Sequence, residues 1–160
     1  MPTKAHAQSI IKNLSASGET VSVAESLTGG GLGHALTQIP GASQVFIGGI
    51  IAYTEDVKVN LLGVPLTLID QFTVVSEEVA VAMANGALEK FGTTWAISTT
   101  GIAGPGDYLG IREGTVWIAI AGPINQTLQL TLDSGRDGVR QGAISSAIGN
   151  FARILSYRTN

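Results

Sequence analysis

Segments with helical hydrophobic periodicity alternate along this chain of 160 residues with short apolar runs typical of buried strands. The predicted helices cover residues 3–16, 30–38, 54–62, 66–71, 76–91 and 135–156, and the predicted strands cover residues 20–25, 46–53, 94–99, 115–121 and 127–133. The short connection between the last two strands predicts an antiparallel hairpin. Helices interleaved with strands, followed by a hairpin, predict an α/β fold. We expect one three-layer α/β/α domain over residues 1–160, with a mixed parallel and antiparallel sheet.

The composition narrows the class of protein. Hydrophobic residues make up 44% of the chain and charged residues 13%, which indicates a compact domain with a buried core. The net charge of −3 provides no basic surface for nucleic acid. The absence of cysteine excludes disulfides and a cysteine nucleophile. No signal peptide or membrane-spanning run is visible, so we expect a cytoplasmic protein without a membrane partner. Low charge together with 21 glycines favours a homo-oligomer, a dimer or larger.

The stretch from Val21 to Gly33, VSVAESLTGGGLG, predicts a buried strand, a tight turn and the start of a helix. Ser26 lies at the junction between strand and helix. Backbone N–H groups at a helix start favour anionic oxygen, so Ser26 could be a nucleophile whose oxyanion is held by amides around Thr28, Gly29 and Gly30. The simpler alternative is that Ser26 only caps the helix.

Other catalytic groups are scarce in this sequence. The two histidines, His6 and His34, show no spacing typical of metal ligands, and no metal or cofactor is expected. A phosphate-binding loop is absent, and the loop from Gly104 to Leu109 lacks the third glycine of the dinucleotide fingerprint. His34 follows Ser26 by only a turn or two of helix and is a poor candidate for its base.

A lysine is the remaining candidate for a base. Lys58 follows the strand predicted to end at Tyr53, and strand ends in an α/β sheet converge on one edge. Ser26, Tyr53 and Lys58 could therefore meet there. A lysine acts as a base only when it is neutral, which requires a lowered pKa. The alternative is an ordinary solvated surface lysine.

Six motifs occur in order through nearly the whole chain: AESLTGG (24–30), GGIIAYTEDVKVNLLGV (48–64), VSEEVAVAMANGAL (75–88), TTGIAGPGD (99–107), GTVWIAI (114–120) and SGRDGVRQ (134–141). On these motifs the chain resembles the CinA C-terminal domain family, which includes the nicotinamide mononucleotide deamidases called PncC. It resembles the stand-alone form, without the amino-terminal nucleotide-pyrophosphatase-like domain of full CinA proteins.

The resemblance implies hydrolysis of the carboxamide of nicotinamide mononucleotide to nicotinate mononucleotide and ammonia, a reaction of the pyridine nucleotide cycle, without a metal. The family's catalytic serine, tyrosine and lysine fall on Ser26, Tyr53 and Lys58. The serine would lose its proton to Lys58 directly or through Tyr53. The residues predicted to bind the substrate are Thr28, Gly29, Gly30, Thr100, Gly101 and Ala103, with Arg136 and Arg140 as candidates for the phosphate. For the arginines the alternative is a solvated helix end, and for the glycines a purely conformational role.

Two departures from the family pattern stand out. Residues 107–113, DYLGIRE, replace small residues and a Lys-Pro-Val-Gly-like segment, and we expect this loop to border the site. Leu27 follows the serine where a smaller residue is common. The competing interpretation is a catalytically silent binding or regulatory domain. The presence of Ser26, Tyr53 and Lys58 together favours the enzyme.

Overall fold

The computed structural model describes residues 2–158 and confirms the alternation of helices and strands. Its elements are α1 (Pro2–Ser17), β1 (Val21–Glu25), α2 (Gly31–Thr37), the 3₁₀ turn η1 (Ala42–Gln44), β2 (Phe46–Ile51), α3 (Glu55–Leu62), α4 (Leu66–Phe72), α5 (Glu77–Phe91), β3 (Trp95–Gly101), β4 (Thr115–Ala121), β5 (Gln126–Thr131) and α6 (Gly135–Arg158). None of the helices in this described part is both long and apolar enough to cross a membrane.

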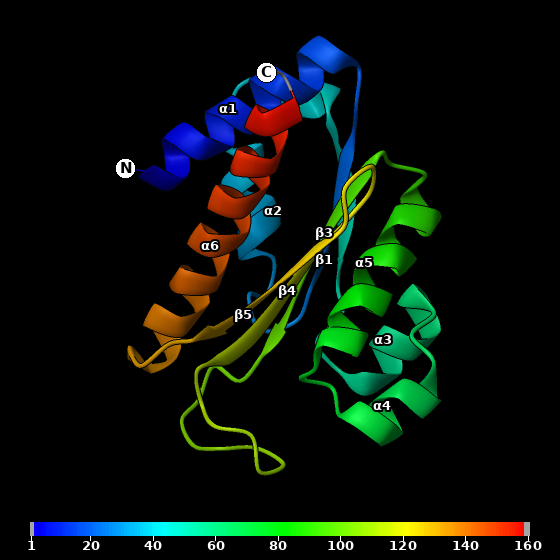
Figure 1. Cartoon of the computed structure of the whole chain (residues 1–160), viewed down its shortest axis with the longest axis vertical. Helices are drawn as coiled ribbons and strands as arrows, with labels where there is room; N and C mark the ends of the chain where they lie inside the picture. The colour runs from blue at the N-terminus through cyan, green and yellow to red at the C-terminus, as the bar shows by residue number, and fades with distance from the viewer. Residues whose placement is uncertain (1, 159–160) are drawn as a thin grey trace.

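The five strands form one mixed sheet in the order β2-β1-β3-β4-β5 (Figure 1). Strand β1 pairs in parallel with both β2 and β3. Strands β3, β4 and β5 pair antiparallel, so the predicted hairpin between β4 and β5 is confirmed. The three parallel strands therefore end at the same edge of the sheet, and that edge is where α/β proteins usually bind ligands.

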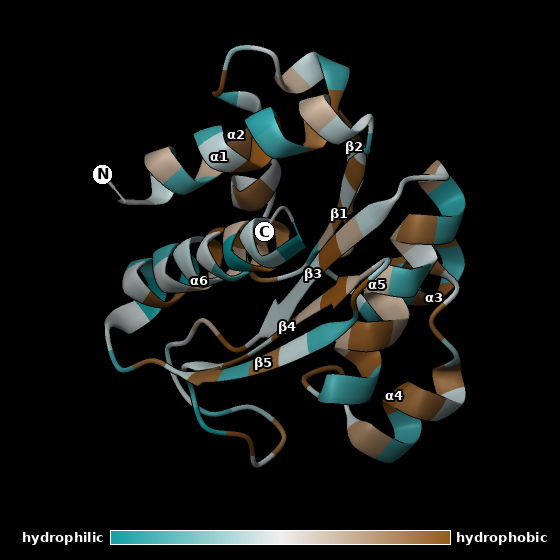
Figure 2. Ribbon diagram, turned by 45° about the horizontal axis from the view of Figure 1, so that its top comes forward, coloured by the Kyte–Doolittle hydropathy of each residue, from teal (hydrophilic) through white to brown (hydrophobic). Residues whose placement is uncertain are grey.

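Helices cover both faces of the sheet and produce the predicted three layers (Figure 1). Helices α1, α2 and α6 pack on one face, and α3, α4 and α5 pack on the other. Side chains alternate between the faces along each strand. Val21 and Val23 of β1 belong to the first core, while Ala24 belongs to the second. Both hydrophobic and hydrophilic segments occur in the covering helices, as expected for helices with one buried face (Figure 2).

One boundary difference shapes the site. The strand predicted over residues 46–53 ends at Ile51, after which the Ala52 N–H still donates to the Glu25 carbonyl at 2.7 Å. The chain then leaves the sheet because Thr54 caps helix α3, where its hydroxyl accepts from the Val57 N–H. The carbonyls of Ala52 and Tyr53 are thereby turned away from the sheet ladder and become available to a side chain.

Candidate active site

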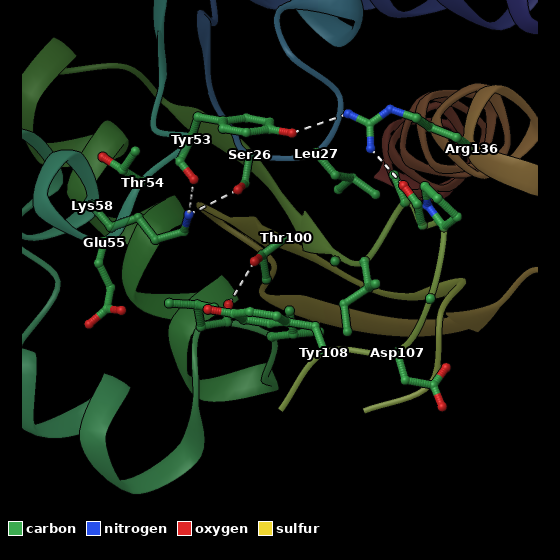
Figure 3. Close-up of a pocket in the computed structure, with 18 residues that line it drawn as sticks. Ser26, Leu27, Tyr53, Thr54, Glu55, Lys58, Thr100, Asp107, Tyr108 and Arg136 are labelled. Atoms are coloured by element: carbon green, nitrogen blue, oxygen red, sulfur yellow. Dashed lines mark hydrogen bonds between the residues drawn. The ribbon is translucent and has the colours of Figure 1, made fainter. Parts of the chain in front are cut away.

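A pocket of about 430 Å³ opens at the edge where β1, β2 and β3 end (Figure 3). Its wall combines segments that lie far apart in the sequence: Ser26 and Leu27 after β1, the start of α3 with Lys58, Val74 and Val75 before α5, residues 100–108 after β3, and Arg136 in the first turn of α6. The parallel arrangement of β1, β2 and β3 brings Ser26, Tyr53 and Lys58 to one edge of the sheet, where the sequence argument expected them to meet.

The backbone of Ser26 is held on both sides. Its N–H donates to the Thr99 carbonyl at 2.9 Å, and its carbonyl accepts from the Gly29 N–H at 3.1 Å. The side chain is 7% exposed and lines the pocket. Helix α2 begins at Gly31, and its N-cap is Gly30 without any side-chain cap bond. Ser26 is therefore not the cap of this helix, and its hydroxyl is directed to the pocket instead.

Lys58 is a buried residue of the pocket, so the interpretation as a surface lysine is wrong. Its side chain is 1% exposed. The Nζ atom donates to Ser26 Oγ at 2.9 Å, to the Ala52 carbonyl at 2.8 Å and to the Tyr53 carbonyl at 3.3 Å. The sequence brings these groups together because α3 begins directly after the early end of β2, and Lys58 lies one turn into that helix.

Burial lowers the pKa of Lys58 from its ordinary value of 10.5 to about 8, because an ammonium loses hydration inside the protein. The negative charge of Glu55 opposes this effect. A neutral amine has two N–H donors and one lone pair. With the donors directed to the Ala52 and Tyr53 carbonyls, the lone pair faces Ser26 Oγ, whose hydroxyl can then donate to it. This is the arrangement of a nucleophile beside its general base.

Tyr53 also lies in the pocket wall, but its hydroxyl faces a different partner. The ring is 55% exposed, and the hydroxyl oxygen accepts from Arg136 Nη2 at 3.2 Å (Figure 3). The backbone carbonyl of Tyr53, rather than its hydroxyl, contacts Lys58. Of the two proton routes considered from the sequence, the geometry favours the direct one between Ser26 and Lys58.

Four of the eight predicted substrate-binding residues line the pocket: Thr100, Gly101, Ala103 and Arg136. The buried Thr100 hydroxyl donates to the Val74 carbonyl at 2.7 Å and ties β3 to the segment before α5. Arg136 Nη1 donates to the Gly104 carbonyl at 2.7 Å. Arg136 therefore bridges the glycine-rich loop and Tyr53 from the start of the long helix α6.

The pocket wall does not include the other four predicted substrate-binding residues, which are Thr28, Gly29, Gly30 and Arg140. The buried Thr28 hydroxyl donates to Glu25 Oε1 at 2.6 Å, and the Gly29 N–H is used by the Ser26 carbonyl. Arg140 Nε donates to the Leu27 carbonyl at 3.0 Å. These residues build and brace the turn that carries Ser26, and the structure places them beside this pocket rather than in its lining.

Glu25 received no role from the sequence, although it is the organising residue of this turn. Its carboxylate is 1% exposed. Oε1 accepts from the Leu32 N–H at 2.8 Å and Oε2 from the Gly33 N–H at 3.0 Å, in addition to the Thr28 hydroxyl. Glu25 thus occupies the N–H donors of the first turn of α2. The available signal was an acidic residue at the end of a buried strand.

The loop that departs from the family pattern does border the site. Asp107 and Tyr108 line the pocket together with residues 104–106. The Glu113 N–H donates to Asp107 Oδ1 at 2.9 Å, and the Glu113 carboxylate accepts from the Gly106 N–H. Tyr108 and Ile111 exchange backbone hydrogen bonds of 3.0 and 2.8 Å. The loop is therefore an ordered small hairpin.

Neither of the two histidines, His6 and His34, lines the pocket. His34 lies on α2 with its Nε2 atom 3.0 Å from Gln38 Nε2, and it is not a lining residue. Within residues 2–158, no three His, Asp or Glu side chains are grouped so that they could hold a metal ion.

Sequence comparisons identify relatives over most of the chain. The family model described as the CinA C-terminal domain matches residues 3–155. A CinA-like protein of Gloeothece citriformis is 56% identical over 142 residues, which are 86% of this chain and 34% of the relative. A CinA-like protein of Prochlorococcus marinus is 49% identical over 154 residues, 94% of this chain and 36% of the relative. The chain spans about a third of the length of these relatives.

Solved structures with the same fold are of similar size. The competence/damage inducible protein CihA from Agrobacterium tumefaciens superimposes with a TM-score of 0.90 at 34% identity, covering 98% of this chain and 96% of that one. A competence-damaged protein (CinA) superfamily protein from Escherichia coli gives a TM-score of 0.92 at 28% identity, covering 95% and 90%. The six ordered motifs, the fold and these matches agree: the chain belongs to the CinA C-terminal domain family.

Proposed function

We propose that this chain is an amidohydrolase that converts nicotinamide mononucleotide to nicotinate mononucleotide and ammonia. The observation that carries the proposal is the 2.9 Å contact between Ser26 Oγ and Lys58 Nζ in a pocket. A buried lysine whose pKa is lowered to about 8 is partly neutral near pH 7 and can take a proton from serine. A purely structural lysine would have no need of a serine hydroxyl beside it in an open pocket.

The first half of the reaction forms an acyl-enzyme. Neutral Lys58 takes the proton of the Ser26 hydroxyl while Oγ attacks the carboxamide carbon. The resulting tetrahedral oxyanion is stabilised by the new positive charge on Lys58. The Lys58 ammonium then donates its proton to the departing amide nitrogen, the C–N bond breaks, and ammonia leaves. An ester joins the nicotinoyl carbon to Ser26.

The second half repeats the same proton transfers with water. Lys58, again neutral, takes a proton from a water molecule that attacks the ester carbon. The bond from that carbon to Ser26 Oγ breaks, and Lys58 returns the proton to Oγ. The acid product leaves, and the pair is restored. The Ala52 and Tyr53 carbonyls hold Lys58 in place in both halves.

The phosphate of the substrate is assigned to Arg136. Its guanidinium lies at the pocket wall and is fixed by Gly104 and Tyr53. An arginine held in this way offers further N–H donors and a permanent charge to phosphate. The first turn of the 24-residue helix α6 adds the positive end of a helix dipole.

The test is release of ammonia and nicotinate mononucleotide from nicotinamide mononucleotide by the purified protein. Replacement of the base in Lys58→Met and of the nucleophile in Ser26→Ala should each reduce kcat by roughly 10²–10⁴-fold. Lys90→Met, at the exposed end of α5, is the matched lysine control and should keep normal activity. No release by folded wild-type protein would overturn the proposal in favour of a binding or regulatory domain.

A further inference from the structure

We infer that Tyr108 determines specificity by covering one face of the substrate's pyridine ring and favouring that ring as a cation. The inference deepens the proposed function and rests on it for the identity of the substrate class. That class is pyridinium carboxamides linked to a phosphorylated sugar, in preference to uncharged ring amides with the same phosphate.

The first observation is the exposure of Tyr108 in a wall of the pocket. The side chain is 54% exposed although it lines the same cavity as Ser26 and Lys58. Its ring lies toward the pocket in the close-up, with Tyr53 on the other side of Ser26 (Figure 3). Covering a solvent-exposed aromatic face with a flat ring lowers the free energy, because both faces are removed from water.

The second observation is that hydrogen bonds hold the backbone of the loop that carries this ring. Glu113 is bonded through its carboxylate to Gly106 and through its N–H to Asp107. Tyr108 is paired with Ile111 across the turn, and Arg136 is bonded to Gly104 at the base of the loop. Because the loop backbone is already bonded, less conformational entropy is lost when a ligand binds against it.

The third observation concerns charge. Glu55 and Asp107 are among the residues of the pocket wall, with their carboxylates directed away from Ser26, while Arg136 provides a positive charge beside Tyr53 (Figure 3). A tyrosine face attracts a cation through its ring quadrupole. The pocket therefore offers separate environments for the two charges of a pyridinium nucleotide: the Tyr108 face for the ring, and Arg136 for the phosphate.

The test measures binding to the Ser26→Ala protein, so that turnover does not interfere. Calorimetry compares nicotinamide mononucleotide with its reduced dihydropyridine form, which keeps the amide and the phosphate but lacks the ring charge. Each is measured with Tyr108 intact, with Tyr108→Phe and with Tyr108→Leu. Tyr157→Leu, a 74% exposed tyrosine at the opposite end of α6 from Arg136, is the control.

We expect Tyr108→Leu to raise the Kd of the cationic nucleotide about five- to tenfold and that of the reduced form less than twofold. Tyr108→Phe and Tyr157→Leu should both leave the Kd near its starting value, because the first keeps the aromatic face and the second lies outside the pocket. Equal losses for the two nucleotides, no loss, or no binding at all would overturn the inference. Ammonia release by wild-type protein, measured separately, decides whether the proposed reaction fails independently of this binding result.

Discussion

At the scale of single residues, the pair of Ser26 and Lys58 is the centre of the proposed chemistry. The 2.9 Å contact and the two backbone carbonyls around Nζ give Lys58 one acceptor position, and that position faces the serine. Tyr53 is adjacent but its hydroxyl is bonded to Arg136. The roles of base and of substrate positioning are therefore assigned to different side chains.

This assignment makes a prediction for Tyr53→Phe. The variant loses the bond to Arg136 but keeps the carbonyl that contacts Lys58. We expect KM for nicotinamide mononucleotide to rise several-fold while kcat stays within about threefold of wild type. A proton relay through the Tyr53 hydroxyl would instead cost roughly 10²-fold or more in kcat, and steady-state kinetics separates the two results.

At the scale of elements, the turn between β1 and α2 owes its shape to Glu25. Three donors converge on this buried carboxylate: the Thr28 hydroxyl and the N–H groups of Leu32 and Gly33. Arg140, on α6, also holds this turn, because its Nε atom donates to the Leu27 carbonyl. The position of Ser26 thus depends on Glu25 and Arg140, two charged residues that do not line the pocket.

The Glu25→Gln substitution tests this dependence. An amide NH₂ in place of one carboxylate oxygen faces a backbone donor and leaves it unpaired. We expect the free energy of unfolding to fall by about 1–3 kcal/mol. We also expect the fold decrease in kcat to exceed the fold increase in KM. Denaturant unfolding and steady-state kinetics give both values. Glu89→Gln, an exposed acid on α5, should change stability by less than about 0.5 kcal/mol; an equal loss there would contradict the role of Glu25.

Much of the element pattern could be predicted because hydrophobic periodicity reports which faces are buried. The approach of Ser26 to Lys58 also followed from the sequence, since parallel strands must end at one edge. The roles of Thr28, Gly29, Gly30 and Arg140 could not be predicted in the same way. Whether an amide or a guanidinium faces a pocket or a neighbouring carbonyl depends on three-dimensional contacts, here those of Glu25, Ser26 and Leu27.

At the scale of the whole molecule, self-association remains a prediction from composition. The edge strand β2 leaves Ile47 and Ile51 more than half exposed, and an edge strand presents unpaired backbone groups. We expect light scattering on the purified chain to give a multiple of its 16.5 kDa mass. A monomer mass at micromolar concentration would contradict this expectation.

The burial of Lys58 also affects the stability of the whole fold. Its pKa is about 8 when folded and near 10.5 when unfolded, so between these values the unfolded chain binds more protons. Stability should therefore rise with pH across this window, by on the order of 3 kcal/mol from this residue. Denaturant unfolding at several pH values measures the rise. The rise should be smaller in Lys58→Met, and identical pH dependence in both proteins would contradict the lowered pKa.

The pH dependence of kcat/KM for ammonia release from nicotinamide mononucleotide tests the role of Lys58 most directly. Only the neutral amine can take the serine proton, so we expect kcat/KM to rise about tenfold per pH unit and to level off above an apparent pKa of about 8. Lys58→Met should lose this rising limb together with most of its activity. A rate already at its plateau near pH 6, or the same rising limb in Lys58→Met, would contradict Lys58 as the base.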